Sequence, residues 1–200
     1  MLLPRPFVHF AARELGRRLA MEGALEVRDP HELIDAIDGV IVGSLELEDE
    51  INAEARELLN QYSDFMRKNE VTYTDMFHRV KRKILEERKV TPAASRVEGE
   101  KISREKIVEL SHAISGKLPR LDGVRVLKGW NAVRLMIARE LTNILAVEEK
   151  VDQRARQMIA GQQRKIVEGG EEWQVLHRRY YEQEMARLGI DMRMPETRES

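Results

Sequence analysis

The stretch DPHELIDAIDGVIVGSLELEDEINAEARELL, residues 29–59, shows most directly which class of fold this chain adopts. Apolar residues recur along it at the three- and four-residue spacing of one helix face. Asp29 is suited to cap the start of a helix, and Pro30 fits its first position because a proline there loses no hydrogen bond. The pattern continues to about residue 66 and predicts one long amphipathic helix. Its apolar face consists of Leu33, Ile37, Ile41, Leu45, Ile51, Leu58 and Leu59.

Shorter elements are predicted on both sides of this helix. A helix is expected over residues 7–22, followed by a short extended piece at residues 24–28. Beyond the long helix, Thr72 and Asp75 resemble a capping box, which predicts a third helix from there to about residue 89. The apolar face of the first helix consists of Val8, Ala11, Leu15 and Leu19.

The same order of elements returns about 100 residues later in the chain. Ser103 is suited to cap a helix that ends at Pro119, an extended piece at residues 124–126 follows, and a second long helix is expected over residues 130–163. Self-similarity at a fixed period is typical of repeat architectures. The sequence therefore predicts an all-α fold, a tandem pseudo-repeat of two three-helix units with a long second helix in each. The predicted parts are a first unit at residues 1–90, a linker at 91–100, a second unit at 101–190 and a flexible tail at 191–200.

Composition narrows the possible compartments and partners. The net charge of −1 gives no general attraction for polyanions, and the absence of cysteine excludes disulfides and thiolate chemistry. The longest aliphatic run, Val40–Val42, is far too short to cross a membrane. The first residues lack the uninterrupted apolar core of a signal peptide. We therefore expect a cytoplasmic protein that does not bind membranes.

The stretch EEWQVLHRRYYEQEM, residues 171–185, holds an unusual set of aromatic and basic side chains. Its apolar residues fit one broad stripe of a helix, which predicts a packed helix instead of a chemical site. On that interpretation His177, Arg178 and Arg179 face solvent or a partner. The stripe consists of Trp173, Leu176, Tyr180, Tyr181, Met185 and Leu188.

Several motifs of the second half resemble a known family. They are KISREKIVELSH (101–112), the extended piece before Trp130, the acidic pair Glu148–Glu149, and EEWQVLHRRYYEQEMARLG (171–189). In these motifs the chain is similar to a bacterial family catalogued as domain of unknown function 507. The first half keeps the helical pattern but has Tyr73 in place of Trp173. The resemblance implies a cytoplasmic bacterial helical protein and implies no activity.

Basic residues gather near the second and third helices of each half, whereas residues 28–66 hold eleven acids and only two bases. Such charge asymmetry on amphipathic helices favours association with a protein partner or with a second copy. The alternative is that the same residues bind the phosphates of RNA or DNA. The candidate binding residues are Arg79, Lys81, Arg82, Lys83, Arg178 and Arg179.

A metal site is a remote alternative. Acid and histidine three residues apart on a helix are found in di-iron bundles, but such sites also need glutamates from other helices. The residues concerned are Glu109 with His112, Asp75 with His78, and Glu48 and Glu148. The two acid–histidine pairs lie in non-equivalent helices, which disfavours a duplicated site. No serine lies in a glycine-rich elbow, and we expect no enzyme activity and no cofactor. The sequence thus favours a non-catalytic protein–protein adaptor or assembly factor.

Overall fold

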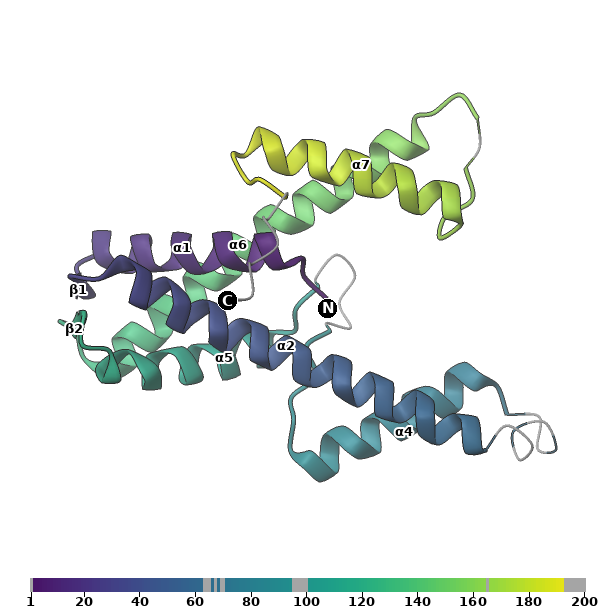
Figure 1. The fold of residues 1–200 in the computed structure, drawn as a ribbon, viewed down its shortest axis with the longest axis horizontal. Helices are drawn as coiled ribbons and strands as arrows, with labels where there is room; N and C mark the ends of the chain where they lie inside the picture. Colours follow the sequence, from purple (N-terminus) through teal and green to yellow (C-terminus); the bar gives the residue numbers. More distant parts are fainter. Residues whose placement is uncertain are drawn as a thin grey trace, which may run out of the picture.

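The computed structural model describes residues 2–62, 66, 68, 71–94, 101–164 and 166–192, and these confirm the all-α prediction. The helices are long and mostly antiparallel to their chain neighbours, with one very small sheet (Figure 1). The elements, in chain order, are α1 (Arg5–Met21), β1 (Leu25–Val27), α2 (Pro30–Gln61), α4 (Tyr73–Arg88), α5 (Arg104–Lys117), the short 3₁₀ helix η1 (Leu118–Arg120), β2 (Val124–Val126), α6 (Trp130–Ala160) and α7 (Glu171–Arg187).

The helix starts predicted from capping residues are confirmed. An oxygen of Asp29 accepts hydrogen bonds from the backbone N–H groups of His31 and Glu32 at the start of α2. Thr72 caps α4 and Ser103 caps α5 in the same way, each through its hydroxyl oxygen and the N–H group three residues on. Each cap satisfies backbone donors that have no partner inside the helix. The structure ends α2 at Gln61, earlier than the apolar pattern predicted.

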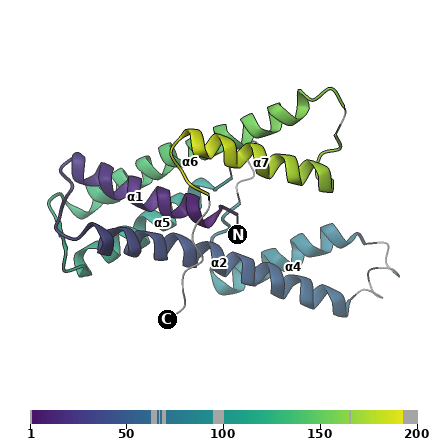
Figure 2. The same cartoon turned by 45° about the horizontal axis from the view of Figure 1, so that its top comes forward.

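One hydrophobic core unites both halves of the sequence. Helix α1 packs on α2 and α6, and α5 packs on α6 and α2, so that the four helices form a central bundle (Figures 1 and 2). Phe7 and Leu15 of α1 are fully buried in this core together with residues from the second half. Among the largest buried side chains are Ile37 of α2, Ile114 of α5 and Ile137 of α6.

The two halves also pair through backbone hydrogen bonds at one end of the bundle. Strand β1 lies antiparallel to β2, with Leu25 opposite Val126 and Val27 opposite Val124. Beside the strands, the carbonyl oxygen of Gly123 accepts from the backbone N–H of Asp29 at 3.2 Å. A Cβ on Gly123 would lie 2.5 Å from the Cβ of Asp29, so only glycine fits where this loop approaches α2.

Two helical hairpins project from the central bundle (Figures 1 and 2). We call the C-terminal part of α2 with α4 the first arm, and the C-terminal part of α6 with α7 the second arm. The first arm has its own small core of Ile51, Ala55, Ile84 and Leu85. The second arm joins the main core through Tyr181 and Met185. Long and short helices follow in the same order in both halves, while the duplication itself stays a prediction.

The described part of the predicted linker, residues 91–94, packs against the start of the predicted second unit. Ala93 is buried, its carbonyl oxygen accepts from the Ser103 N–H at 2.7 Å, and Ala94 forms a β-bridge with Ile102. Residues 95–100 of this linker lie outside the described residues. Of the predicted tail, Met192 packs against the main core, and residues 193–200 lie outside the described residues.

Charged side chains join α1 to α6 at the edge of the core. The guanidinium of Arg18 donates to Glu14 on its own helix and to Glu140 on α6, both at 2.7 Å. The pKa of Glu14 is lowered to about 2, chiefly by a hydrogen bond from Arg17; partial burial opposes the shift and the bond from Arg18 adds to it. The pKa of Glu140 is also lowered, first of all by its bond from Arg18. Both carboxylates therefore keep their charge to a lower pH in the folded chain than an ordinary glutamate does.

This network predicts a loss of stability in acid. In the unfolded chain Glu14 titrates near its ordinary pKa of 4.5, whereas in the folded chain it titrates near 2. As the pH falls below 4.5 the unfolded chain takes up a proton that the folded chain excludes, so the free energy of unfolding falls until the pH reaches about 2. Urea unfolding of Glu14→Gln should therefore depend less on pH across this window than that of the parent. The exposed Glu57→Gln serves as a control, and an unchanged pH slope in Glu14→Gln would contradict the prediction.

Candidate partner-binding surface

The six candidate basic residues lie on two different arms. Arg79, Lys81, Arg82 and Lys83 belong to α4 of the first arm, and Arg178 and Arg179 belong to α7 of the second. Both views show these arms as separate hairpins, so the structure does not bring the six side chains together on one surface (Figures 1 and 2). A partner that contacts all six would have to reach both arms.

Half of these residues are paired within the chain. The ammonium of Lys81 lies 2.6 Å from the buried carboxylate of Glu48, and only 18% of the Lys81 side chain is exposed. The other two intramolecular pairs are exposed: Lys83 lies 3.9 Å from Glu87 on α4, and Arg178 lies 3.0 Å from Glu182 on α7. Arg79, Arg82 and Arg179 are exposed, and within the described residues no carboxylate pairs with them. Within the part of the chain that the structure describes, these three cations are therefore accessible to a partner.

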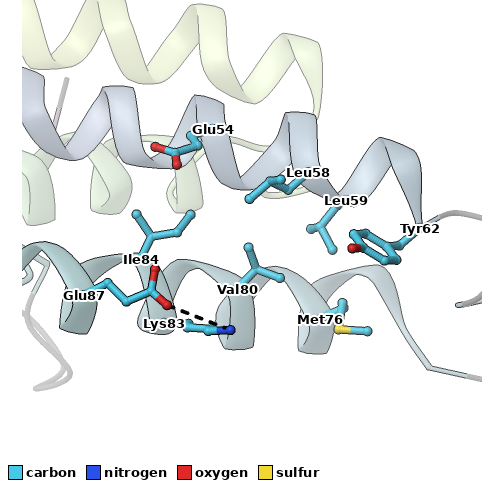
Figure 3. Close-up of a pocket in the computed structure, with 9 residues that line it drawn as sticks. All are labelled: Glu54, Leu58, Leu59, Tyr62, Met76, Val80, Lys83, Ile84 and Glu87. Atoms are coloured by element: carbon cyan, nitrogen blue, oxygen red, sulfur yellow. Dashed lines mark ion pairs between the residues drawn. The ribbon is translucent and has the colours of Figure 1, made fainter.

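A groove runs along the first arm between α2 and α4 (Figure 3). It encloses about 400 Å³ and is mainly apolar. Lys83 and Glu87 border it on α4, and Glu54 borders it on α2. Its apolar lining consists of Leu58, Leu59 and Tyr62 from α2 and of Met76, Val80 and Ile84 from α4. A side chain of a partner could bury apolar surface here, which is the usual driving force for binding.

Charged side chains border both sides of this groove: Glu54 on α2, and Lys83 with Glu87 on α4. Glu50, Glu54 and Glu57 are spaced four and three residues apart, which places them along one side of α2. We call them the acidic row. Arg79 and Lys83 are four residues apart on α4, and we call them the basic row. Glu54 pairs with Arg88 at 2.5 Å, but among the described residues no cation pairs with Glu50 or Glu57. The groove therefore has a polarity that an incoming helix must match.

At an offset of 100 residues along the sequence, the second arm has different side chains from the first. Tyr180 of α7 lies 100 residues after Val80 of the first arm, and Gln162 lies 100 residues after Tyr62. The amide of Gln162 donates to the Tyr180 hydroxyl oxygen at 2.5 Å, so a larger side chain and a hydrogen bond span this part of the second arm. Both side chains fit an apolar helical pattern, and the difference in size between Val80 and Tyr180 is the sequence signal that could have indicated the groove.

A buried polar cluster holds α7 on α6 in the second arm. One oxygen of the fully buried Glu148 accepts from the Tyr181 hydroxyl at 2.7 Å and from the Lys101 ammonium at 2.5 Å. Asp152, one turn further along α6, contacts the His177 ring nitrogen at 2.9 Å and the Arg156 guanidinium at 2.7 Å. We call these residues the Glu148 cluster. Its members come from α6, α7 and the segment before α5.

Burial and neighbouring charges shift the pKa values of Tyr181 and Asp152 in the Glu148 cluster. Burial raises the pKa of Tyr181 strongly, and the nearby charge of Glu148 raises it further, so the phenol stays a hydrogen-bond donor. Burial would raise the pKa of Asp152, but the hydrogen bond from Arg156 and the charge of Lys101 outweigh it and lower the value. The second oxygen of Glu148 is buried without a hydrogen-bond partner among the described residues. The cluster thus joins α6, α7 and the segment before α5 by hydrogen bonds and ion pairs.

The packed-helix prediction for residues 171–185 is confirmed, with two corrections. Tyr181 and Met185 are buried as expected, but Leu188, predicted on the same stripe, is 49% exposed. His177 was predicted to face solvent or a partner, and this is wrong because its ring is partly buried, bonded to Asp152 and stacked on Trp173. The helical stripe alone could not show this, because Asp152 lies on another helix.

The residues of the remote metal hypothesis lie apart in the structure. Glu109 contacts the buried ammonium of Lys106 at 2.9 Å, and the His112 ring lies 5.5 Å from that of Trp130. Among the described residues, no three histidine or acidic side chains gather where they could hold a metal ion. Nor does any helix in the described ranges combine the length and apolar character needed to cross a membrane.

The comparisons with known proteins extend the resemblance seen in the second half. A family model described as Protein of unknown function (DUF507) matches residues 1–190, which include both arms and the whole central bundle. A comparison with curated proteins found no match. The family description assigns no activity. Any inference about function must therefore rest on the geometry of the two arms.

Proposed function

We propose that this chain, which belongs to the DUF507 family of proteins of unknown function, is a non-catalytic protein–protein adaptor or assembly factor of the bacterial cytoplasm. The observation that carries the proposal is the apolar groove of the first arm between its acidic and basic rows. The absence of cysteine and the family resemblance support the cytoplasmic assignment. The role requires neither a cofactor nor a reaction.

The groove is suited to an amphipathic helical partner. An apolar helix face placed between α2 and α4 would remove Leu58, Met76 and Val80 from water, and these side chains are only partly buried in the free chain. Basic residues of the partner would face the acidic row, and its acidic residues would face the basic row. Complementary charges of this kind fix orientation and exclude wrong partners more than they add affinity.

Binding of RNA or DNA is the second candidate function. Arg79 and Arg82 favour it, because both are exposed on one helix without a carboxylate partner among the described residues. Against it, Lys81 and Lys83 of the same helix are paired with Glu48 and Glu87. The acidic row on the neighbouring helix would also repel phosphates. A protein partner therefore fits the first arm better.

An affinity pull-down tests the proposed function. The tagged full chain is compared with Leu58→Asp, which puts a charge into the groove, and with Val108→Asp, a matched change at an exposed position of α5. We expect a protein that survives nuclease treatment and whose recovery falls at least about tenfold with Leu58→Asp and not with Val108→Asp. RNA in the eluate, loss of the bound set with nuclease, and equal recovery by both variants would overturn the adaptor proposal and favour the second candidate.

A further inference from the structure

We propose that the occupant of the first-arm groove is a second copy of this chain, and that two first arms pair about a twofold axis. The inference rests on the proposed function, because it names the partner of the same groove. In this pairing α2 of each copy lies against α4 of its partner, so that the two hairpins form one four-helix bundle.

Charge complementarity identifies a second copy as the partner. The C-terminal half of α2, residues 46–61, carries six acidic residues and one arginine, while α4 carries five lysine and arginine residues and three acidic ones. An arm with one acidic and one basic helix is complementary to itself when each α2 meets the other copy's α4. The same surface then serves both copies, which is the usual form of a twofold interface.

Of the two rows, Glu54 and Lys83 line the groove, and the helical spacing places Glu50, Glu57 and Arg79 beside them on the same helix faces. Glu50 and Glu57 are exposed, and no cation among the described residues pairs with them. Arg79 is exposed as well, and no carboxylate among the described residues pairs with it. In the paired form the acidic row of one copy faces the basic row of the other, twice, by symmetry. The opposite arrangement, α2 against α2, would bring two acidic rows together and is disfavoured by repulsion.

Aromatic side chains border the same surface. Tyr62 lines the groove and is 53% exposed, and Tyr73 at the start of α4 is 49% exposed and stacks on Phe77. Large aromatic residues are typical anchors of protein interfaces, because they bury much surface with few rotatable bonds. Their exposure in the single chain is accounted for if a second arm covers them.

The second arm explains why only the first arms pair. There Tyr180 and Gln162 occupy the positions of Val80 and Tyr62 and bond to each other, which leaves less room for a side chain from outside. The double change Tyr62→Gln with Val80→Tyr transfers this arrangement to the first arm. Because the second arm folds with these residues, the transfer is expected to close the groove without unfolding the hairpin.

Sedimentation velocity of the full chain tests the pairing. The parent is expected to be a dimer, and the groove-closing double variant is expected to raise the dissociation constant at least about tenfold. Two charge variants sharpen the test: one reverses the acidic row by Glu50→Lys and Glu57→Lys, and the other reverses the basic row by Arg79→Glu and Lys83→Glu. Each is expected to be monomeric alone, because like charges then face each other. Their equimolar mixture is expected to recover the dimer.

The outcomes separate this inference from the proposed function. A parent that stays monomeric at about 100 μM, well above the dissociation constant of an ordinary stable dimer, overturns the inference. A dimer that all three variants retain also overturns it, and so does failure of the mixed variants to associate while circular dichroism shows native helix content. If the chain is monomeric but captures another protein through Leu58, the proposed function stands without a second copy. If the chain forms no dimer and captures no protein through the groove, both the pairing of the arms and the proposed function are overturned.

Discussion

Ile37→Ala and Ile137→Ala are each expected to lower the free energy of unfolding by about 2–5 kcal/mol, which corresponds to a fall in Tm of about 5–15 °C. The two isoleucines lie on α2 and α6, and they are 1% and 0% exposed in the same hydrophobic core. Each substitution removes buried methyl and methylene groups and leaves a cavity that close-packed neighbours cannot fill completely.

Because the core is shared, each substitution should shift the unfolding of the whole chain. Circular dichroism and calorimetry should show one transition, moved to lower temperature in both variants. If the halves were independent domains, each substitution would move only one of two transitions. Val175→Ala, at a 69% exposed position of α7, is the control and should change the free energy of unfolding by less than about 0.5 kcal/mol. Two separate transitions would contradict the shared core.

Much of the fold could be predicted from the sequence because its signals are local. Asp29, Thr72 and Ser103 accept hydrogen bonds from N–H groups two or three residues away, so the chain itself contains both partners. The amphipathic spacing that predicted α2 and α6 is likewise a property of neighbouring turns. The end of the long helix was predicted less well than its start. The structure ends α2 at Gln61 and not near residue 66, because an apolar pattern does not show where a helix stops.

The contacts between elements could not be predicted in this way. Nothing near Arg18 in the sequence indicates that it bonds to Glu140, and nothing near His177 indicates Asp152, because these partners lie on other helices. Lys81 shows the same limit. It belongs to a basic run and was predicted to bind a partner, yet it lies against the buried Glu48. Exposure and pairing depend on which helix faces meet, and the helical period leaves that open.

The groove depends on a still smaller feature. Val80 and Tyr180 satisfy the same apolar pattern, but the difference between a small and a large side chain determines how much space remains between the helices. The sequence placed Arg79 and Lys83 of the basic row on one predicted helix with Lys81 and Arg82, and the structure has all four on α4. It did not identify the apolar surface beside that row, because Leu58 and Leu59 fit the apolar face of the long helix and such a face does not show which of its residues stay accessible.

Glu148→Ala is expected to lower the free energy of unfolding by about 3–5 kcal/mol. Removing one partner of a buried ion pair leaves the remaining charge, here the ammonium of Lys101, without its counter-charge. Its carboxylate is fully buried and accepts from Lys101 and from the Tyr181 hydroxyl. In this variant the buried Tyr181 hydroxyl loses the carboxylate oxygen to which it donates its hydrogen bond. Glu148→Gln retains an acceptor oxygen and should cost less.

An exposed ion pair on the same helix hairpin gives the matched comparison. Glu182→Ala removes the partner of Arg178, and both side chains are largely exposed, so the expected cost is below about 1 kcal/mol. Urea unfolding of Glu148→Gln, Tyr181→Phe and the double variant measures the coupling across the hydrogen bond, expected at about 1 kcal/mol or more. Equal effects of Glu148→Ala and Glu182→Ala, or a coupling near zero, would show that α7 is held on α6 by its apolar contacts through Met185 and not by the Glu148 cluster.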